Sequence, residues 1–185
     1  MKIWKDDCRN VSKYLQLHST QYEDNEGNHK EWSWVSRPNN IKAVMIIPIV
    51  ESETDNNKIC IIKEFRVSIK DYEWGFPAGL IDENEPVEDC IRRELKEETG
   101  LDLELIYEVT PFVFNSPGIT DESIAIAFVK ANGELSINNL EASEDIEQFL
   151  LNQGEVKELL LQKDKKFGAK ALLIMKYFAR TNHIT

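Results

Sequence analysis

Apolar positions along the chain follow two patterns, one typical of strands and one typical of helices. Residues 42–50 and 58–65 are rich in branched side chains and flank a polar loop, which predicts neighbouring β-strands. Shorter apolar runs predict three more strands, and apolar residues at helical spacing predict two C-terminal helices. The further strands are expected at residues 104–113, 123–130 and 146–151, and the helices at residues 155–162 and 168–179.

A separate pair of strands is expected before residue 40. Residues 11–22 alternate loosely, residues 31–35 are aromatic, and turn formers lie between them, which predicts a β-hairpin. The segment Arg37-Pro38-Asn39-Asn40 then breaks the pattern. We therefore expect a hairpin arm at residues 1–39 and a main domain at residues 40–185.

One further helix has both of its ends marked. Pro86 is a favoured first-turn residue with acidic side chains around it, and Gly100 is a favoured residue just past a last helical turn. Strands that flank one central helix and are followed by terminal helices favour an α+β fold or a mixed-sheet sandwich.

Two acidic residues of this helix fall on its apolar face. At about 100° per residue, Cys90, Ile91 and Leu95 define an arc that must face the protein, and Glu94 and Glu98 lie inside it. Burying two unpaired carboxylates at i and i+4 is costly, so a cation should lie between them. Mg²⁺ is the natural candidate because it takes oxygen ligands and brings substrate phosphates with it. The alternative is a helix at the sheet edge, with both carboxylates solvated or paired with Arg93.

The loop before the helix adds a possible ligand. The stretch from Gly75 to Asp82 has little side-chain bulk, which lets backbone groups approach a ligand closely, so a loop carbonyl could be a third metal ligand. The alternative is a plain turn that needs two glycines.

Composition excludes several classes of protein. The 33 acidic residues against 22 Lys and Arg give a net charge of −11, the wrong sign for a nucleic-acid-binding protein. The longest apolar run is far shorter than the roughly 20 residues that span a bilayer, and no signal peptide is evident, so we expect a cytoplasmic protein without a membrane partner. The three cysteines show no C-x-x-C spacing and are expected to be reduced thiols.

The segment from Gly79 to Leu101 matches the pattern of the Nudix box without a gap. Gly79 is followed after five residues by Glu85, and after seven more by the run Arg93-Glu94-Leu95-Lys96-Glu97-Glu98-Thr99-Gly100-Leu101. The chain therefore resembles the Nudix hydrolases, a family that cleaves nucleoside diphosphates linked to another moiety, using Mg²⁺ or Mn²⁺. The resemblance implies an α/β/α sandwich around a mixed sheet, with the hairpin arm added at the N-terminus.

The resemblance also implies roles for individual residues. Glu94 and Glu98 would be metal ligands together with the Ala78 carbonyl, and Glu97 would be a further ligand. Arg93 would orient the glutamates. Three more residues would support the structure of the box, namely Gly79, Glu85 and Gly100.

Outside the box, most of the chain is similar to the ADP-ribose pyrophosphatase branch of the family. Residues 62–66 and 76–82 match that branch's strand, arginine and box entry, with Arg66 as the arginine. Ser116-Pro117-Gly118 supplies the proline that the branch carries past the box. The resemblance implies that Arg66 and Gly118 contact the substrate.

The predicted arm also matches this branch. Tyr14 and Trp32 stand where these enzymes hold adenine between two aromatic rings, and Arg37 follows. In that branch the arm is exchanged between two subunits, which implies a homodimer here. We expect Trp32 and Trp34, separated by Ser33, to face different sides of their strand, with Trp32 toward the base and Trp34 in packing.

Three positions bear on substrate range and on the catalytic base. Tyr14 stands where a tryptophan is often found, and Gly75 stands where several relatives place a glutamate. In the resembling branch a loop glutamate acts as general base, and Ser143-Glu144-Asp145-Ile146 fits that loop best, so Glu144 is the expected base. The alternative is that the acids of this loop form a solvated face.

The leading hypothesis is metal-dependent hydrolysis of ADP-ribose, a nucleotide small-molecule substrate, to AMP and ribose 5-phosphate. One rival is another Nudix substrate, such as a sugar nucleotide, a dinucleoside polyphosphate or an oxidised nucleotide. Two further rivals are a non-catalytic module that binds ADP-ribose and a structural or interaction protein with an acidic surface.

Overall fold

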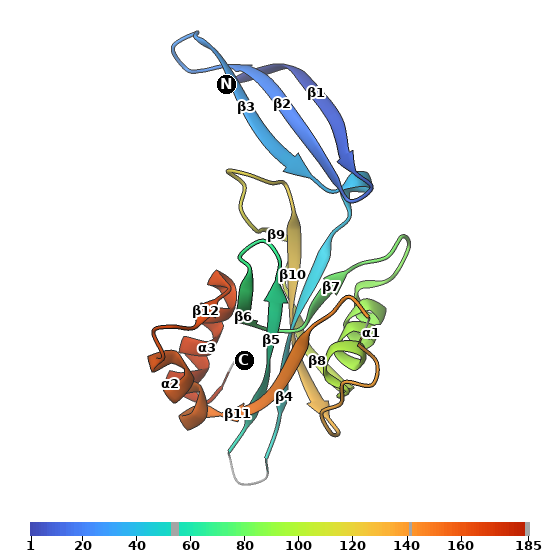
Figure 1. The fold of residues 1–185 in the computed structure, drawn as a ribbon, viewed down its shortest axis with the longest axis vertical. Helices are drawn as coiled ribbons and strands as arrows, with labels where there is room; N and C mark the ends of the chain where they lie inside the picture. Colours follow the sequence, from blue (N-terminus) through green and yellow to red (C-terminus); the bar gives the residue numbers. More distant parts are fainter. Residues whose placement is uncertain (53–55, 141, 184–185) are drawn as a thin grey trace.

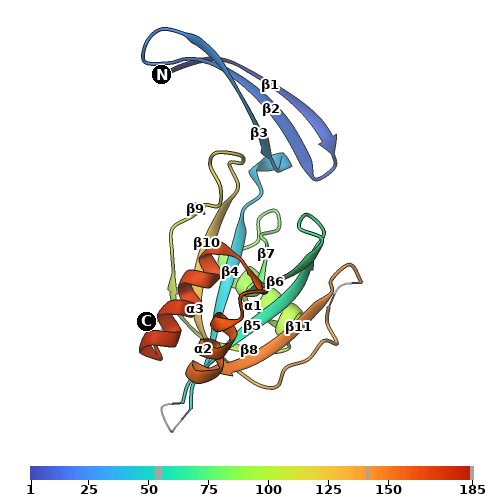
Figure 2. The ribbon, with the colours of Figure 1, turned by 60° about the vertical axis from the view of Figure 1, so that its left-hand side comes forward.

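The computed structural model of the chain describes residues 1–52, 56–140 and 142–183. A three-stranded N-terminal sheet lies at one end of a body in which helices cover both faces of a mixed sheet (Figure 1). The short 3₁₀ helix η1 (Pro38–Asn40) joins the two parts (Figure 2). The fold is therefore an α+β sandwich with an N-terminal arm.

The arm contains three antiparallel strands rather than two. The predicted hairpin is present as β2 (Leu15–Glu23) and β3 (His29–Ser36), and β1 (Lys2–Ser12) pairs with the free side of β2. Strand β1 was not predicted as a strand of its own, because both of its faces are exposed and its side chains do not alternate between apolar and polar. The expectation that Tyr14 lies on a strand is wrong, since it lies in the turn between β1 and β2.

The body is built on a nine-stranded sheet whose path runs β12-β6-β5-β4-β10-β8, with β11 beside β5, β7 beside β4 and β9 beside β10. The sheet is mixed because β10 is parallel to β4 and β12 is parallel to β6, whereas the other pairs are antiparallel. The strands are β4 (Ala43–Val50), β5 (Lys58–Arg66), β6 (Asp71–Gly75), β7 (Ala78–Leu80), β8 (Asp102–Val109), β9 (Val113–Phe114), β10 (Ser123–Asn132), β11 (Ile146–Asn152) and β12 (Lys166–Phe167).

All the predicted strands of the body are present, but the predicted C-terminal boundary of one of them was wrong. The run predicted at residues 104–113 ends as β8 at Val109, and β9 is a separate two-residue strand. The strands β6, β7 and β12 were not predicted because five or fewer residues are too short to show a period.

Central strand β4 is buried on both faces, which explains its continuous apolar sequence. Val44 and Ile46 pack toward α1 (Val87–Thr99), while Ile47 packs with Met175 and Phe178. The last two residues belong to α3 (Ala169–Thr181), which pairs with α2 (Gln153–Leu161) on the opposite face of the sheet from α1 (Figure 1). In the described part of the chain, no helix is long and apolar enough to cross a membrane.

Both predicted ends of the central helix are confirmed. Pro86 caps the N-terminus of α1, and Gly100 follows its last residue in the left-handed conformation with φ 77°. The Gly100 N–H donates to the Lys96 carbonyl, which closes the final turn. A Cβ at this position would lie 2.6 Å from both the Cβ and the backbone nitrogen of Ser136, so glycine is required here for its conformation and for its size.

We predict that Gly100→Ala lowers the free energy of unfolding by roughly 1–3 kcal/mol, because a side chain at positive φ is strained and meets Ser136. Urea denaturation followed by circular dichroism measures the change. Gly118→Ala is the matched control, since a Cβ there has no atom within 4 Å and no positive φ is involved. Equal effects of the two substitutions would contradict the assignment.

Candidate active site

The two inward-facing glutamates of α1 lie where the helical periodicity predicted them. Glu94 is 8% exposed and Glu98 is 4% exposed, in the same range as the apolar residues beside them. Their neighbours Ile91 and Leu95 are fully buried against the sheet. The helix therefore directs two carboxylates, together with its apolar side chains, toward the protein.

Glu98 has one described hydrogen bond, from the backbone of β7. Its Oε2 accepts from the Ala78 N–H at 3.0 Å. Burial raises the pKa of the Glu98 carboxyl well above its usual range, and the negative charges of Glu94, Glu64 and Glu144 add to this shift, whereas the Ala78 amide opposes it. The protein therefore holds a carboxylate where its ionised form is unfavourable unless a cation is present.

Arg93 links one member of this pair, Glu94, to two further carboxylates. Its Nε and Nη2 each donate to one oxygen of Glu85 at 2.9 Å, a bidentate arrangement. Its Nη1 donates to Glu94 at 2.6 Å and to Glu97 at 3.2 Å. The guanidinium lowers the pKa of Glu85 to about 2, while burial raises the pKa of Glu94 and Arg93 opposes that rise. Arg93 thus contacts Glu85, Glu94 and Glu97 directly.

Gly79 is required by the close approach of Glu94. A Cβ on Gly79 would lie 1.8 Å from the carboxyl carbon of Glu94, closer than any two non-bonded heavy atoms can approach. A side chain at position 79 would therefore displace the Glu94 carboxylate from the place where it lies. Glycine at position 79, in the segment before α1, therefore lets the Glu94 carboxylate lie against the backbone.

A further carboxylate, which the sequence analysis missed, faces the same place from the sheet. Glu64 on β5 shares a face of its strand with Cys60, which packs in the core beneath α1. Its side chain is 17% exposed, and its charge acts on Glu98. Burial raises the pKa of Glu64, and the charge of Glu144 contributes to the rise. Strand alternation could have placed Glu64 on the same face as Cys60, but the pairing of strands distant in sequence decides what covers that face.

Glu144 belongs to the same cluster of charges. It precedes β11, whose first residue Ile146 pairs with Glu64. The neighbouring Asp145 ties this loop to the sheet, since its carbonyl accepts from the Phe65 N–H at 3.0 Å and its carboxylate accepts from the Tyr72 hydroxyl at 2.7 Å. The loop is therefore held so that the charge of Glu144 bears on the buried glutamates.

The donor set suits a hard divalent cation, although it is not a closed cage. Oxygen ligands from carboxylates are those that Mg²⁺ prefers, and Mg²⁺ commonly keeps several waters and substrate phosphates as its other ligands. Among residues 1–52, 56–140 and 142–183, no three His, Cys, Asp or Glu side chains are grouped closely enough to hold an ion by themselves. An ion here would therefore share Glu94 and Glu98 with backbone, water or substrate oxygens.

A cavity of about 500 Å³ brings together four of the predicted residues: Arg37, Arg66, Ala78 and Gly79. Two of these wall residues also meet the buried pair, since the Ala78 N–H donates to Glu98 and the Glu94 carboxylate lies against Gly79. Each arginine is held by acidic neighbours. The Nε of Arg37 donates to Glu122 at 2.7 Å, and Arg66 contacts Glu64 and Glu73 at 2.5 and 3.3 Å. Two guanidinium groups thus face a cavity whose wall residues Ala78 and Gly79 separate it from the buried glutamates.

The predicted aromatic residues are not brought together within one chain. Tyr14 lines a cavity of about 350 Å³ with Arg37, whereas Trp32 lines another of about 630 Å³ between the arm and the loop after β9. Gly118 lies in that loop between Pro117 and Ile119, which line the larger and the smaller cavity respectively.

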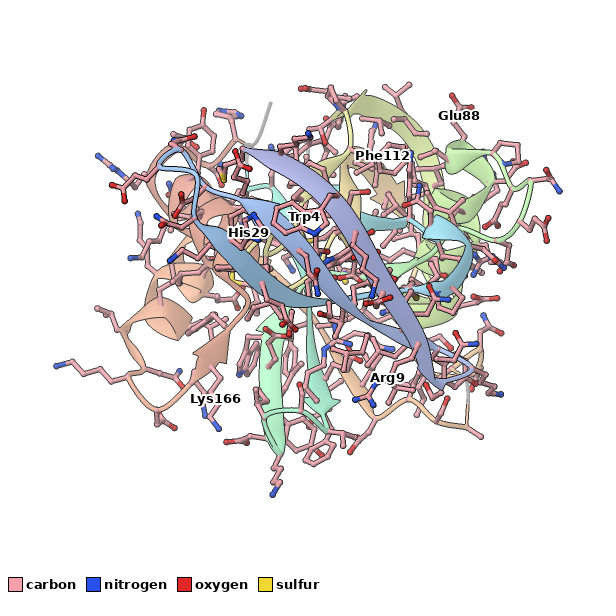
Figure 3. The ribbon with its side chains drawn as sticks, turned by 90° about the horizontal axis from the view of Figure 1, so that it is seen from above. Trp4, Arg9, His29, Glu88, Phe112 and Lys166 are labelled. Carbon is pink, nitrogen blue, oxygen red and sulfur yellow. The ribbon has the colours of Figure 1, made fainter. Side chains whose placement is uncertain are left out.

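The expectation that Trp32 and Trp34 face different sides of β3 is wrong. Both line the larger cavity, because residues two apart on a strand point to the same face. The packing role expected of Trp34 is present, since its ring stacks on His18 with centroids 3.8 Å apart. The opposite face of the arm is turned outward and carries Trp4 against His29, as Figure 3 shows.

We predict that Glu85→Gln lowers the free energy of unfolding by about 1–3 kcal/mol near neutral pH, because it breaks the bidentate pair with Arg93. Since the folded pKa of Glu85 is about 2, against a usual 4.5, its stabilisation is complete above 4.5 and is lost as the pH falls toward 2. Urea denaturation should therefore show a difference from the wild type that shrinks with acidification.

Glu104→Gln is the matched control for this prediction. It makes the same chemical change at a surface ion pair with Lys130, remote from the cluster, and should alter the unfolding free energy by less than about 0.5 kcal/mol. If Glu85→Gln lowers the unfolding free energy equally at all pH values, the Glu85–Arg93 ion pair is not the origin of the effect.

Comparison with known proteins places this geometry in a family. An ADP-sugar pyrophosphatase of Mus musculus is 30% identical over 126 residues, which cover 66% of this chain and 57% of the mouse protein. An ADP-ribose pyrophosphatase of Saccharomyces cerevisiae is 29% identical over 164 residues, covering 83% of this chain and 71% of the yeast protein. The crystal structure of an ADP compounds hydrolase covers 100% of this chain and 96% of its own, with a TM-score of 0.74 and 24% identity, and so shares the fold.

The family model described as NUDIX domain matches residues 39–172, a span that contains α1, the loop before it, Glu64 and Glu144. The resemblance that the spacing of the acidic residues indicated is thereby confirmed. The chain belongs to the NUDIX domain family.

Proposed function

We propose that this protein hydrolyses the pyrophosphate bond of ADP-ribose, giving AMP and ribose 5-phosphate, with a divalent metal ion. The observation that carries the proposal is the buried pair Glu94 and Glu98, whose carboxylates lie against Ala78 and Gly79 in the wall of a cavity that two arginines line. Buried carboxylates without a cation are unfavourable, and a pyrophosphate brings both the negative charge and the metal that such a cavity requires. The pyrophosphatase relatives support this choice of substrate.

Mg²⁺ or Mn²⁺ would be held by Glu94, Glu98 and the Ala78 carbonyl, with Glu97 as a further ligand. When bound, the ion neutralises charge on the pyrophosphate oxygens and lowers the pKa of a water molecule. Arg93 would keep the glutamates in place, since it already contacts Glu94 and Glu97.

The chain's own cations and bases would complete the reaction. Arg66 and Arg37 would hold the phosphate oxygens from the cavity wall, where planar guanidinium groups can donate two hydrogen bonds each. Glu144 would accept a proton from the attacking water, because its charge bears on the buried glutamates and its loop is tied to the sheet. The carboxylate of Glu144 would later release that proton to solvent.

The adenine would stack on the arm, and this requires a second subunit. Tyr14 and Trp32 line separate cavities in one chain, so a base held between two such rings needs one ring from another copy. An exchange of arms in a homodimer would supply it, and the exposed apolar side chains of the arm would be covered. Gly118 would let the loop after β9 approach the base closely, since no side chain intervenes.

A second candidate is hydrolysis of a bulkier ADP compound. Gly75 lies two residues from Glu73 on the same face of β6, and a Cβ added to it would meet no atom within 4 Å. The space left there could admit a larger group beyond the pyrophosphate than ribose phosphate. Comparing kcat/KM for ADP-ribose, a sugar nucleotide and a dinucleoside polyphosphate separates the two candidates.

We predict opposite effects of Glu98→Gln on activity and on stability. Turnover of ADP-ribose with Mg²⁺ should fall by at least about 100-fold, because a metal ligand is lost. The metal-free variant should melt at a higher temperature than the wild type near pH 7.5 and show little difference near pH 4.5. The sign follows from the raised folded pKa of Glu98, since the wild type loses stability as the pH rises above 4.5.

Glu104→Gln again serves as the control, because it should leave both turnover and melting temperature close to those of the wild type. Chelation by EDTA should abolish turnover in the wild type and in the control. Undiminished hydrolysis in EDTA, or normal turnover by Glu98→Gln, would refute the metal-dependent proposal.

A further inference from the structure

Two carboxylates hold Arg66 from neighbouring strands. Glu64 on β5 and Glu73 on β6 are directly opposite each other in the antiparallel register. The Nη1 of Arg66 donates to Glu64 at 2.5 Å, and its Nε donates to Glu73 at 3.3 Å. The guanidinium therefore bridges a cross-strand pair of acids that would otherwise repel each other.

The two acids differ in what else they approach. Glu64 is 17% exposed and its charge reaches Glu98, one of the buried pair on α1. Glu73 lies at the other end of the bridge, where its Oε1 is 3.2 Å from the position of a Cβ on Gly168, the residue before α3. Glu64 thus lies between Arg66 and the carboxylate cluster, whereas Glu73 lies beside the residue that precedes α3.

The bridge limits where Arg66 can point. Arg66 lies at the end of β5 with its side chain 44% exposed, so a guanidinium without partners would sample many rotamers. Holding an arginine in one rotamer costs side-chain entropy, and the two acids meet part of that cost before any ligand arrives. The two contacts use only part of the five N–H donors of the guanidinium, so phosphate oxygens can still be bound.

We propose that Glu64 and Glu73 are positioning residues, which hold the Arg66 guanidinium against the cavity so that it binds a metal-complexed pyrophosphate group. Glu73 acts through Arg66 alone, and Glu64 acts both through Arg66 and on the metal cluster. This inference rests on the proposed function, because it takes a pyrophosphate as the ligand of the cavity.

The effect of removing Glu73 on the affinity for an anionic ligand has opposite signs if Glu73 acts by its charge and if it acts by positioning Arg66. Removing a negative charge near an anionic ligand strengthens binding by Coulomb's law. Loss of a positioning residue weakens binding instead, because the entropy cost of fixing the Arg66 side chain is then met when the ligand binds. Glu73→Gln keeps an oxygen that can accept from Arg66, whereas Glu73→Ala does not, so the two variants should differ.

Calorimetric titration with inorganic pyrophosphate and saturating Mg²⁺ tests this without any turnover of a nucleotide. We expect Glu73→Ala to weaken binding by about 3- to 10-fold and Glu73→Gln to weaken it less. In an Arg66→Ala background, Glu73→Ala should have no further effect, because its action passes through Arg66. Tighter or unchanged binding by Glu73→Ala, or an equal loss in both backgrounds, would overturn the proposal.

Titration with Mg²⁺ alone separates the two acids. Glu64→Gln should weaken Mg²⁺ binding, Glu73→Gln should leave it unchanged, and the control Glu104→Gln should change neither ligand. Equal effects of Glu64→Gln and Glu73→Gln on Mg²⁺ would contradict the division of roles. Thermal unfolding of each variant confirms that it is folded.

A kinetic assay distinguishes this inference from the proposed function. If the wild type hydrolyses ADP-ribose, Glu73→Gln should raise KM more than it lowers kcat. Wild-type protein that binds pyrophosphate as described but leaves ADP-ribose intact would refute the proposed substrate and keep the inference. If the wild type is active but substitutions at Glu73 and Arg66 affect pyrophosphate binding independently, the inference is refuted and the proposed substrate stands.

Discussion

The burial of Glu94 and Glu98 on the apolar face of α1 is the constraint on which the rest of the site depends. Ionised carboxylates in that position are unfavourable, and burial raises the pKa of both. The protein tolerates them because Arg93 and the Ala78 amide each make a hydrogen bond to one of them. Gly79 follows from the same constraint, since any side chain there would occupy the place of the Glu94 carboxylate.

The sheet is arranged so that its other acidic and basic side chains meet this helix. β5 brings Glu64 to the face beneath α1 and ends at Arg66, while the loop before β11 brings the charge of Glu144 to the same place. Helices α2 and α3 cover the opposite face and supply packing through residues such as Phe178. The buried glutamates thus lie on the α1 face of the sheet, while the cavity beside them also reaches Ala43 and Ile124, which pack in the core that α2 and α3 cover.

Local pattern was sufficient to predict the central helix, both of its ends and its two inward glutamates, because helical periodicity and terminal residues act within a few turns. It was insufficient for Glu64, which becomes part of the site only through the pairing of strands distant in sequence. It also failed for β1, which is exposed on both faces. The resemblance of residues 79–101 to a family pattern compensated for some of these gaps, since it carries information about long-range contacts.

The central claim is that Glu94 and Glu98 together hold a divalent cation. Anomalous scattering from crystals soaked in Mn²⁺ tests it most directly, since the ion is located independently of any substrate. The account predicts a peak within about 2.0–2.3 Å of carboxylate oxygens of both residues. The absence of that peak at saturating Mn²⁺, with Glu94 still bound to Arg93, or a peak confined to surface acids, would contradict the account.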